Sequence, residues 1–272
     1  MHNPKHRLRL CAAVVAPALL GLLAAGTASA SVRTTPSTTG TTITTINAAG
    51  YEASGRDFRY IQALIRVPDW TPTGLEPHEY IQLSNGSLGS GDQSVRVGVT
   101  YQAGVWETFI ASQDNSLFPI HYYLPRNGLH PGDGVLFSIY FDQAGNELHF
   151  SITPPTDSGL PDTFKTQAYG PIFDHAAAVD DWTYTTGQPA PLPPFLNPFT
   201  INSFLQGALT TYSGAKGSFV GPWTTSQVEA TSAGLPYPAN TIRVQPGPLG
   251  SDGLKANGAA RAGDMFAVNA VG

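Results

Sequence analysis

Cysteine is almost absent from this sequence: the only one, Cys11, lies close to the N-terminus. A single cysteine cannot form an intramolecular disulfide, so the fold must rest on a buried core. Charged residues are also scarce, at 12% of the chain. No long stretch repeats apolar residues at the spacing of three and four that marks an amphipathic helix. These absences exclude a disulfide-stapled scaffold and argue against a helical protein.

The N-terminal residues are typical of a secretory signal peptide. Residues 5–9 carry three basic side chains, residues 11–26 form an apolar run, and residues 28–30 read Ala-Ser-Ala, a small-residue cleavage pattern. The apolar run is too short for a convincing membrane span. We expect residues 1–30 to be removed and the protein to be secreted into the extracellular space. An uncleaved anchor is the open alternative.

Export makes the protein more acidic. Loss of the three basic residues of the leader takes the formal net charge from −5 to −8. An acidic protein is a poor partner for nucleic acid or an anionic membrane surface, so we expect neither partner, and no stable membrane insertion once the signal is cleaved. We expect a monomer. The remaining histidines show no metal-ligand spacing, and neither a metal nor another cofactor is expected; they are His78, His121, His130, His149 and His175.

After the leader, short apolar runs alternate with Gly, Pro, Asn and Asp. Residues 31–45 are rich in Thr and Ser and read as a linker or the remnant of a pro-segment. The roughly 240 residues of the mature chain suffice for one β-domain, placed at residues 46–272. The pattern predicts an all-β sandwich of two antiparallel sheets. The expected strands are 58–67, 79–83, 95–101, 105–110, 121–124, 135–141, 147–152, 163–168, 199–204, 218–223, 227–230, 241–245 and 264–271.

The segment 95–101 is the most informative of these strands. Valines alternate with Arg96, Gly98 and Thr100. Successive side chains on a strand point to opposite faces, so the valines face the core and Arg96 faces away from it. The adjacent glycine leaves room in front of the arginine. The residues that lie opposite Arg96 are therefore the main clue to the function.

Common catalytic signatures are missing from the sequence. It contains no Gly-x-Ser-x-Gly elbow, no phosphate-binding loop before a helix, and no second histidine after His78-Glu79 to complete a zinc-protease motif. Paired carboxylates are the remaining candidates for acid–base chemistry. Glu79 and Glu107 lie on expected strands, and Asp180 and Asp181 are adjacent. Each of them also fits an ordinary solvated strand or turn position.

The order of several motifs resembles the glutamic peptidases, or eqolisins. The similarity spans residues 46–271, and each motif alone is short. The matching segments are Asn47–Tyr51 to the family's Asn-Trp-x-Gly, Phe58–Pro68 to a strand that ends in Val-Pro, Tyr80–Leu83 to Trp-Val-Gly-Ile, Val95–Val99 to Leu-Gln-Thr-Gly, Trp106–Phe109 to Trp-Tyr-Glu-Trp, Pro131–Asp133 to a Gly-Asp turn, and Ala178–Trp182 to Ile-Ile-Glu-Asp-Phe.

This resemblance implies a concanavalin A-like sandwich, or jelly roll, with one sheet bent around a concave groove. Family catalysis uses a glutamate as general base and then acid, and a glutamine that holds the water and stabilises the oxyanion. The glutamine position falls on Arg96 and the glutamate position on Asp180. The family's supporting acidic residue falls on Thr108. The implied groove residues are Tyr80, Trp106, Glu107 and Thr108.

Both catalytic positions therefore differ from the family pattern. If Arg96 meets Asp180, the two form a charge-assisted pair, and a carboxylate held in this way is a poor proton donor. Aspartate is also one methylene shorter than glutamate, which displaces the carboxyl. We expect hydrolysis to be lost or strongly reduced. If the register differs by one residue, Asp181 or Gln102 would lie in the groove instead.

Three functions remain open from the sequence. The first is a secreted, glutamic-peptidase-like protein that binds an extended peptide in its groove with little or no hydrolysis. The second is an acid endopeptidase with an altered pair of catalytic residues. The third is a carbohydrate-binding module, in which aromatic side chains stack on sugar rings. The aromatic candidates for that role are Trp70, Trp106, Tyr122 and Tyr123.

Overall fold

The computed structural model describes the central domain and parts of the C-terminal region. The described residues are 40–45, 47–68, 71–72, 75–88, 93–113, 122–153, 162–168, 173–184, 209–211, 216–217, 219, 223–231, 243–246 and 268–271. They belong to one compact unit that starts at Thr35. Every regular element within these ranges is a β-strand, and a search of them for a helix long and apolar enough to cross a bilayer finds none.

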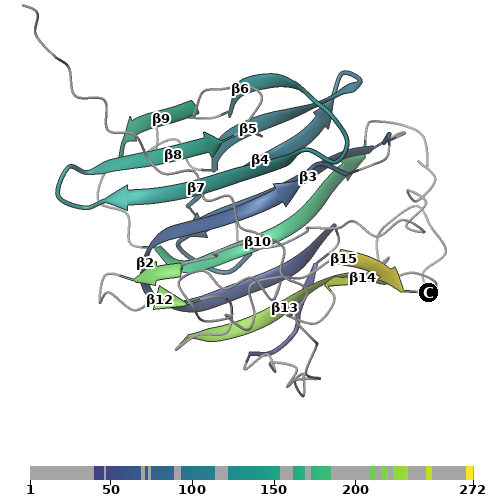
Figure 1. The fold of residues 1–272 in the computed structure, drawn as a ribbon. Helices are drawn as coiled ribbons and strands as arrows, with labels where there is room; N and C mark the ends of the chain where they lie inside the picture. The colour runs from purple at the N-terminus through teal and green to yellow at the C-terminus, as the bar shows by residue number, and fades with distance from the viewer. Residues whose placement is uncertain are drawn as a thin grey trace, which may run out of the picture. The chain divides into compact units, whose positions relative to one another are not determined.

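Fifteen strands make up the described fold (Figure 1). They are β1 (Ile43–Thr45), β2 (Ala48–Arg66), β3 (Leu75–Ser84), β4 (Ser94–Gln102), β5 (Val105–Gln113), β6 (Tyr122–Leu129), β7 (Gly134–Asp142), β8 (Glu147–Thr153), β9 (Asp162–Gln167), β10 (Phe173–Tyr184), β11 (Leu209–Thr211), β12 (Lys216–Gly217), β13 (Thr224–Thr231), β14 (Arg243–Pro246) and β15 (Val268–Val271).

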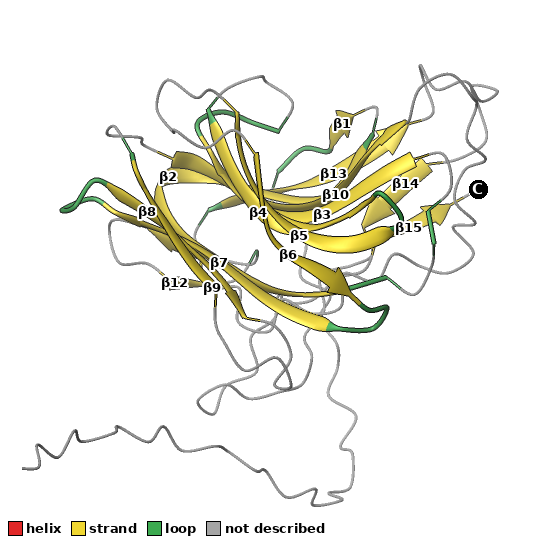
Figure 2. Ribbon diagram, turned by 90° about the horizontal axis from the view of Figure 1, so that it is seen from above, coloured by secondary structure: helices red, strands yellow, loops and turns green. Residues whose placement is uncertain are grey.

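The long strand β2 belongs to both layers of the sandwich. Its first half pairs with β10 and β13, and its second half pairs with β7. The main sheet runs β15-β14-β13-β2-β10-β3-β4-β5-β6, whereas β7, β8 and β9 extend the other layer. Figure 2 shows these two layers. The predicted all-β sandwich is confirmed. One described pairing, β1 with β13, is parallel rather than antiparallel.

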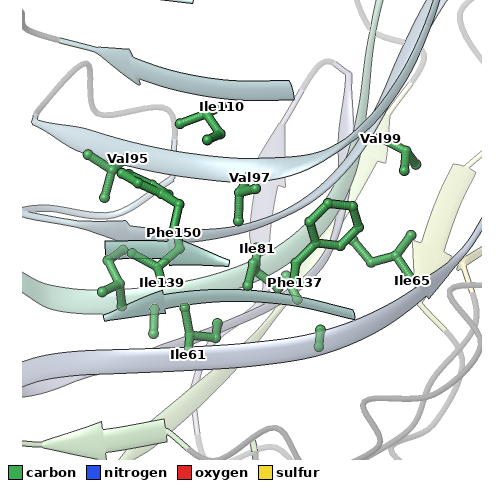
Figure 3. Close-up of a cluster of buried hydrophobic side chains, with 14 of the residues drawn as sticks. Ile61, Ile65, Ile81, Val95, Val97, Val99, Ile110, Phe137, Ile139 and Phe150 are labelled. Atoms are coloured by element: carbon green, nitrogen blue, oxygen red, sulfur yellow. The ribbon is translucent and has the colours of Figure 1, made fainter. Parts of the chain in front are cut away.

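The core lies between the two layers, as Figure 3 shows. One layer contributes Ile61, Ile65, Phe137, Ile139 and Phe150, and the main sheet contributes Ile81, Val95, Val97, Val99 and Ile110. Each of these side chains is at most 1% exposed. Full burial of such a side chain contributes about 1.5–3 kcal/mol, so a core of this size can hold a fold without disulfides. The valine alternation predicted for β4 is confirmed.

The side of the main sheet that points away from this core is called the outer face below. It carries a second, smaller group of buried apolar side chains, the outer cluster. Its members are Ala48, Tyr80, Phe109, Val179 and Val228. The outer face of the main sheet therefore also buries some apolar side chains.

Two long strands were missed or shortened because their residues do not alternate, and the short strands β11 and β12 were not predicted either. β10 was not predicted, because Ala176–Ala178 are weak strand formers that show no alternation of apolar and polar residues. β2 starts at Ala48 rather than residue 58, for the same reason. Residues 43–45, expected in the linker, pair with β13. Of the expected strand 218–223, Phe219 and Trp223 lie in bends. The expected strand 199–204 lies outside the described residues.

Gly98 allows a close approach between two strands. It lies opposite Tyr80 on β3 and Phe109 on β5. A Cβ atom on Gly98 would come within 1.9 Å of the Glu79 carbonyl oxygen and 2.6 Å of the Tyr80 Cα. The space beside Arg96 is thus filled by Tyr80, and the expectation of open room there is wrong.

We predict that Gly98→Ala destabilises the protein. The added methyl must push β3 and β4 apart, which costs on the order of 1–3 kcal/mol. Urea denaturation measures the change. Gly134→Ala on β7 is the matched control, because its Cβ would meet Leu64 at an ordinary 3.5 Å. Equal stability of the two variants would contradict the prediction.

Candidate functional site

Strand register decides which acidic residue faces Arg96. On the β3–β10 ladder Asp180 lies opposite Glu79, and Asp181 lies opposite His78. Cross-strand partners share a face, and a shift of one residue moves a side chain to the other face. Asp180 therefore points to the core, and Asp181 lies on the outer face with Arg96. The expected Arg96–Asp180 pair is wrong, and the one-residue alternative, Asp181, is the residue that Arg96 meets.

Four side chains from three strands meet at Asp181 on the outer face, and we call them the Asp181 cluster: His78, Tyr80, Arg96 and Asp181. The Tyr80 hydroxyl donates to Asp181 Oδ2 at 2.9 Å, and Arg96 Nη1 lies 3.5 Å from the same oxygen. His78 Nδ1 lies 2.9 Å from Oδ1, although not in line for a hydrogen bond. Oδ2 of Asp181 is therefore bonded by two donors, whereas Oδ1 has only the His78 ring nearby.

Tyr80 holds this cluster against the sheet. Burial, and then the neighbouring charge of Asp181, raise the pKa of its phenol well above the ordinary value. The hydroxyl therefore stays protonated and can donate to Asp181. The Arg96 guanidinium lies over the Tyr80 ring, with Cζ 5.1 Å from the ring centroid, a cation–π geometry. One aromatic side chain thus positions both charged partners.

The outer contacts of the cluster are longer. Arg96 Nη2 donates to Gln113 Oε1 at 3.4 Å, while Arg96 Nε is buried without a hydrogen-bond partner. His78 Nε2 lies 3.6 Å from Glu76 Oε1, and its ring packs edge-on against Phe109. The guanidinium retains unused donor capacity, since the side chain of Arg96 is 26% exposed. No three His, Cys, Asp or Glu side chains are grouped to hold a metal within the described ranges.

The other expected groove residues divide between the two faces. Glu107 lies on the outer face opposite Thr100 and is 8% exposed. Trp106 and Thr108 are buried on the core face, where Trp106 packs edge-on against Tyr101. Trp106 is 3% exposed and Thr108 is fully buried, so both belong to the core face and not to the outer face that carries Arg96. Trp70 and the side chains of Tyr122 and Tyr123 lie outside what the structure describes.

Asp180 forms a buried acid pair with Glu79. The two lie opposite each other on adjacent strands, and both are at most 1% exposed. None of their four carboxyl oxygens has a hydrogen-bond partner. Burial, and then the charge of Asp180, raise the pKa of Glu79 well above its usual range; burial, and then Asp181, do the same for the pKa of Asp180. This pair therefore favours protonated carboxyls.

The alternation of side chains along β3 indicates the core-facing position of Glu79. In the expected strand 79–83, Glu79 has the same parity as Ile81 and Leu83, which are core residues. A core-facing glutamate was therefore predictable from β3 alone. Its partner was not, because the register of β10 against β3 cannot be read from either strand.

Comparison with solved structures finds similarity to glutamic peptidases. Scytalido-glutamic peptidase with a peptide-based transition state analog is 13% identical at a TM-score of 0.41, covering 50% of this chain and 64% of that chain. SCP-B, a member of the Eqolisin family, in a complex with the tripeptide Ala-Ile-His is 11% identical at a TM-score of 0.37, covering 50% and 63%. The chain spans less than two thirds of these peptidases' length. No protein-family model and no curated protein matches.

We predict that the buried acid pair makes the fold more stable in acid. Both pKa values are raised above those of the unfolded chain, which are about 4. The stability that the pair contributes is thus fully present below about pH 4 and is lost as pH rises through the folded-state pKa values. Urea midpoints measured from acid to alkaline pH should fall less steeply in a Glu79→Gln/Asp180→Asn double variant than in the parent protein.

Glu107→Gln is the control for this experiment. It removes a carboxylate from the outer face of the same sheet, and its pH profile should follow that of the parent protein. A parent profile that rises with pH, or a double variant with the parent's slope, would contradict a protonated pair.

Proposed function

We propose that this chain is a secreted, glutamic-peptidase-like protein that binds extended polypeptide on the outer face of its main sheet, with hydrolysis lost or strongly reduced. The observation that carries the proposal is the contact of Asp181 Oδ2 with Arg96 and Tyr80, with the His78 ring beside Oδ1. The order of the motifs along residues 46–271 supports the resemblance to glutamic peptidases.

Hydrolysis by activated water needs a carboxyl that takes a proton from water and then gives one to the leaving amine. Asp181 is poorly suited to this task, because a guanidinium and a phenol already contact its Oδ2 oxygen and the His78 ring lies beside Oδ1. Asp180 is buried on the core face, where no substrate reaches it. The position of the expected catalytic amide is filled by Arg96, which is a donor only. The described outer face therefore favours binding over cleavage.

Ligand contact on the outer face can use two kinds of surface. Arg96 keeps free donors that suit the carbonyl or carboxylate oxygens of a polypeptide, since its contacts to Gln113 and Asp181 are 3.4 and 3.5 Å long. Each member of the outer cluster is at most 6% exposed, so the cluster adds apolar contacts only when the side chains that cover it move away. An extended chain presents backbone oxygens and apolar side chains together, which matches this combination.

We predict that the purified secreted chain binds an unstructured polypeptide at acid pH without cleaving it. Fluorescence anisotropy with a fluorescein-labelled unfolded casein measures binding, and gel electrophoresis of the same mixture measures cleavage. Arg96→Ala should weaken binding about tenfold, because a charge-assisted contact is lost.

Arg66→Ala is the matched control, since Arg66 lies on the second half of β2, away from the main sheet's outer face. It should bind like the parent protein. Robust turnover that disappears in Asp181→Ala would show an active peptidase and overturn the proposal. Undiminished binding by Arg96→Ala would remove the outer face as the binding surface.

A further inference from the structure

A short loop segment folds back onto the outer face. It consists of residues 85–88, which follow β3, and is called the strap. Its base is closed by the Asn85 amide, which donates to the Gln93 carbonyl at 2.9 Å. The Ser84 hydroxyl donates to the Gly86 carbonyl at 3.0 Å. At its other end, Leu88 packs against the outer cluster. The strap therefore brings an aliphatic side chain onto the face proposed to bind polypeptide.

Two carboxylates tether the strap. Glu52 on β2 accepts the Ser87 hydroxyl at 2.8 Å through Oε1 and the Leu88 amide at 2.5 Å through Oε2. Asp174 on β10 accepts the Gly86 amide at 2.8 Å through Oδ1. Three consecutive strap residues are thus held by side chains from two strands. Such contacts to ionised acceptors are about twice as strong as neutral ones.

The position of these carboxylates is itself well defined. The side chain of Glu52 is 3% exposed, which is costly for a carboxylate unless donors surround it. His175 lies between the two acids, with Nδ1 2.6 Å from Asp174 Oδ1 and Nε2 3.8 Å from Glu52 Oε1. The donors that compensate Glu52 include the strap's own Ser87 and Leu88. The strap and the buried acid therefore stabilise each other.

Leu88 remains only partly buried, although its backbone is tethered by Glu52 and its side chain packs against the outer cluster. It covers a cluster that contains Tyr80, and Tyr80 also bonds Asp181 and carries Arg96 on its ring. The covered surface is thus continuous with the Asp181 cluster. A polypeptide side chain that reaches the outer cluster from the side of the strap takes the place of Leu88, which packs there.

We infer that the strap is an internal stand-in for the ligand: Leu88 occupies the site on the outer cluster that an aliphatic side chain of a bound polypeptide takes. This inference rests on the proposed function and narrows its ligand class to polypeptides that carry an aliphatic residue. An intramolecular competitor lowers the apparent affinity by the fraction of molecules in which the site is occupied. Removing or releasing Leu88 should therefore strengthen binding.

The test uses a fluorescein-labelled peptide that carries the strap's own Asn-Gly-Ser-Leu sequence, and a second peptide with Ser in place of Leu. Leu88→Ala in the full secreted chain should raise affinity for the first peptide about five- to tenfold and leave the second unchanged. Glu52→Ala, which frees the strap without altering Leu88, should act in the same direction. Glu229→Gln, an acid on β13 away from the strap, is the control and should bind like the parent protein.

Hydrogen exchange of the Leu88 amide tests the strap without any peptide. In the parent protein this amide should exchange slowly, and Glu52→Ala should accelerate it. Fast exchange of this amide in the parent protein would overturn the inference. Unchanged or weaker peptide binding by Leu88→Ala would overturn it as well. If the amide is protected but no variant binds either peptide, the proposed function and the ligand class fail while the intramolecular contact stands.

Discussion

The alternation of side chains along β10 is the constraint on which the rest of this molecule depends. Asp180 and Asp181 are neighbours in sequence, yet the ladder with β3 sends them to opposite faces of the main sheet. One joins Glu79 in the core, where neither acid has a hydrogen-bonding partner. The other joins His78, Tyr80 and Arg96 on the outer face. Two identical carboxyls thus acquire opposite environments from one ladder.

The two environments offer the carboxyls different partners. On the core face, burial without donors favours the neutral acid. On the outer face, the Tyr80 hydroxyl donates to Asp181 and the Arg96 guanidinium forms an ion pair with it. Glu79, the residue opposite Asp180, is also acidic. Neither carboxyl can therefore be neutralised by an ion pair with the other. One face of the sheet therefore carries a pair of buried acids, and the opposite face carries the ion pair of Asp181.

Sequence reasoning succeeded where residues alternate and failed where they do not. The valines of β4 and the strands β7 and β8 were predicted because apolar and polar residues follow a period of two. β10 contains three alanines in a row, so neither its existence nor its facing could be read from pattern. Its register against β3 is a long-range property, and an error of one residue exchanged Asp180 for Asp181. Trp106 and Thr108 were misplaced for the same reason, since motif order alone does not fix a face.

Tyr80 links the parts that sequence reasoning left separate. Its ring needs Gly98 on β4, because any side chain there would meet the β3 backbone. Its hydroxyl fixes Asp181, its face carries Arg96, and its apolar body belongs to the cluster that Leu88 covers. A glycine that first suggested empty space in front of an arginine is therefore the reason that the space is full. The glycine, the aromatic ring and the carboxylate thus form one connected arrangement across β4, β3 and β10, in which each position depends on the one before it.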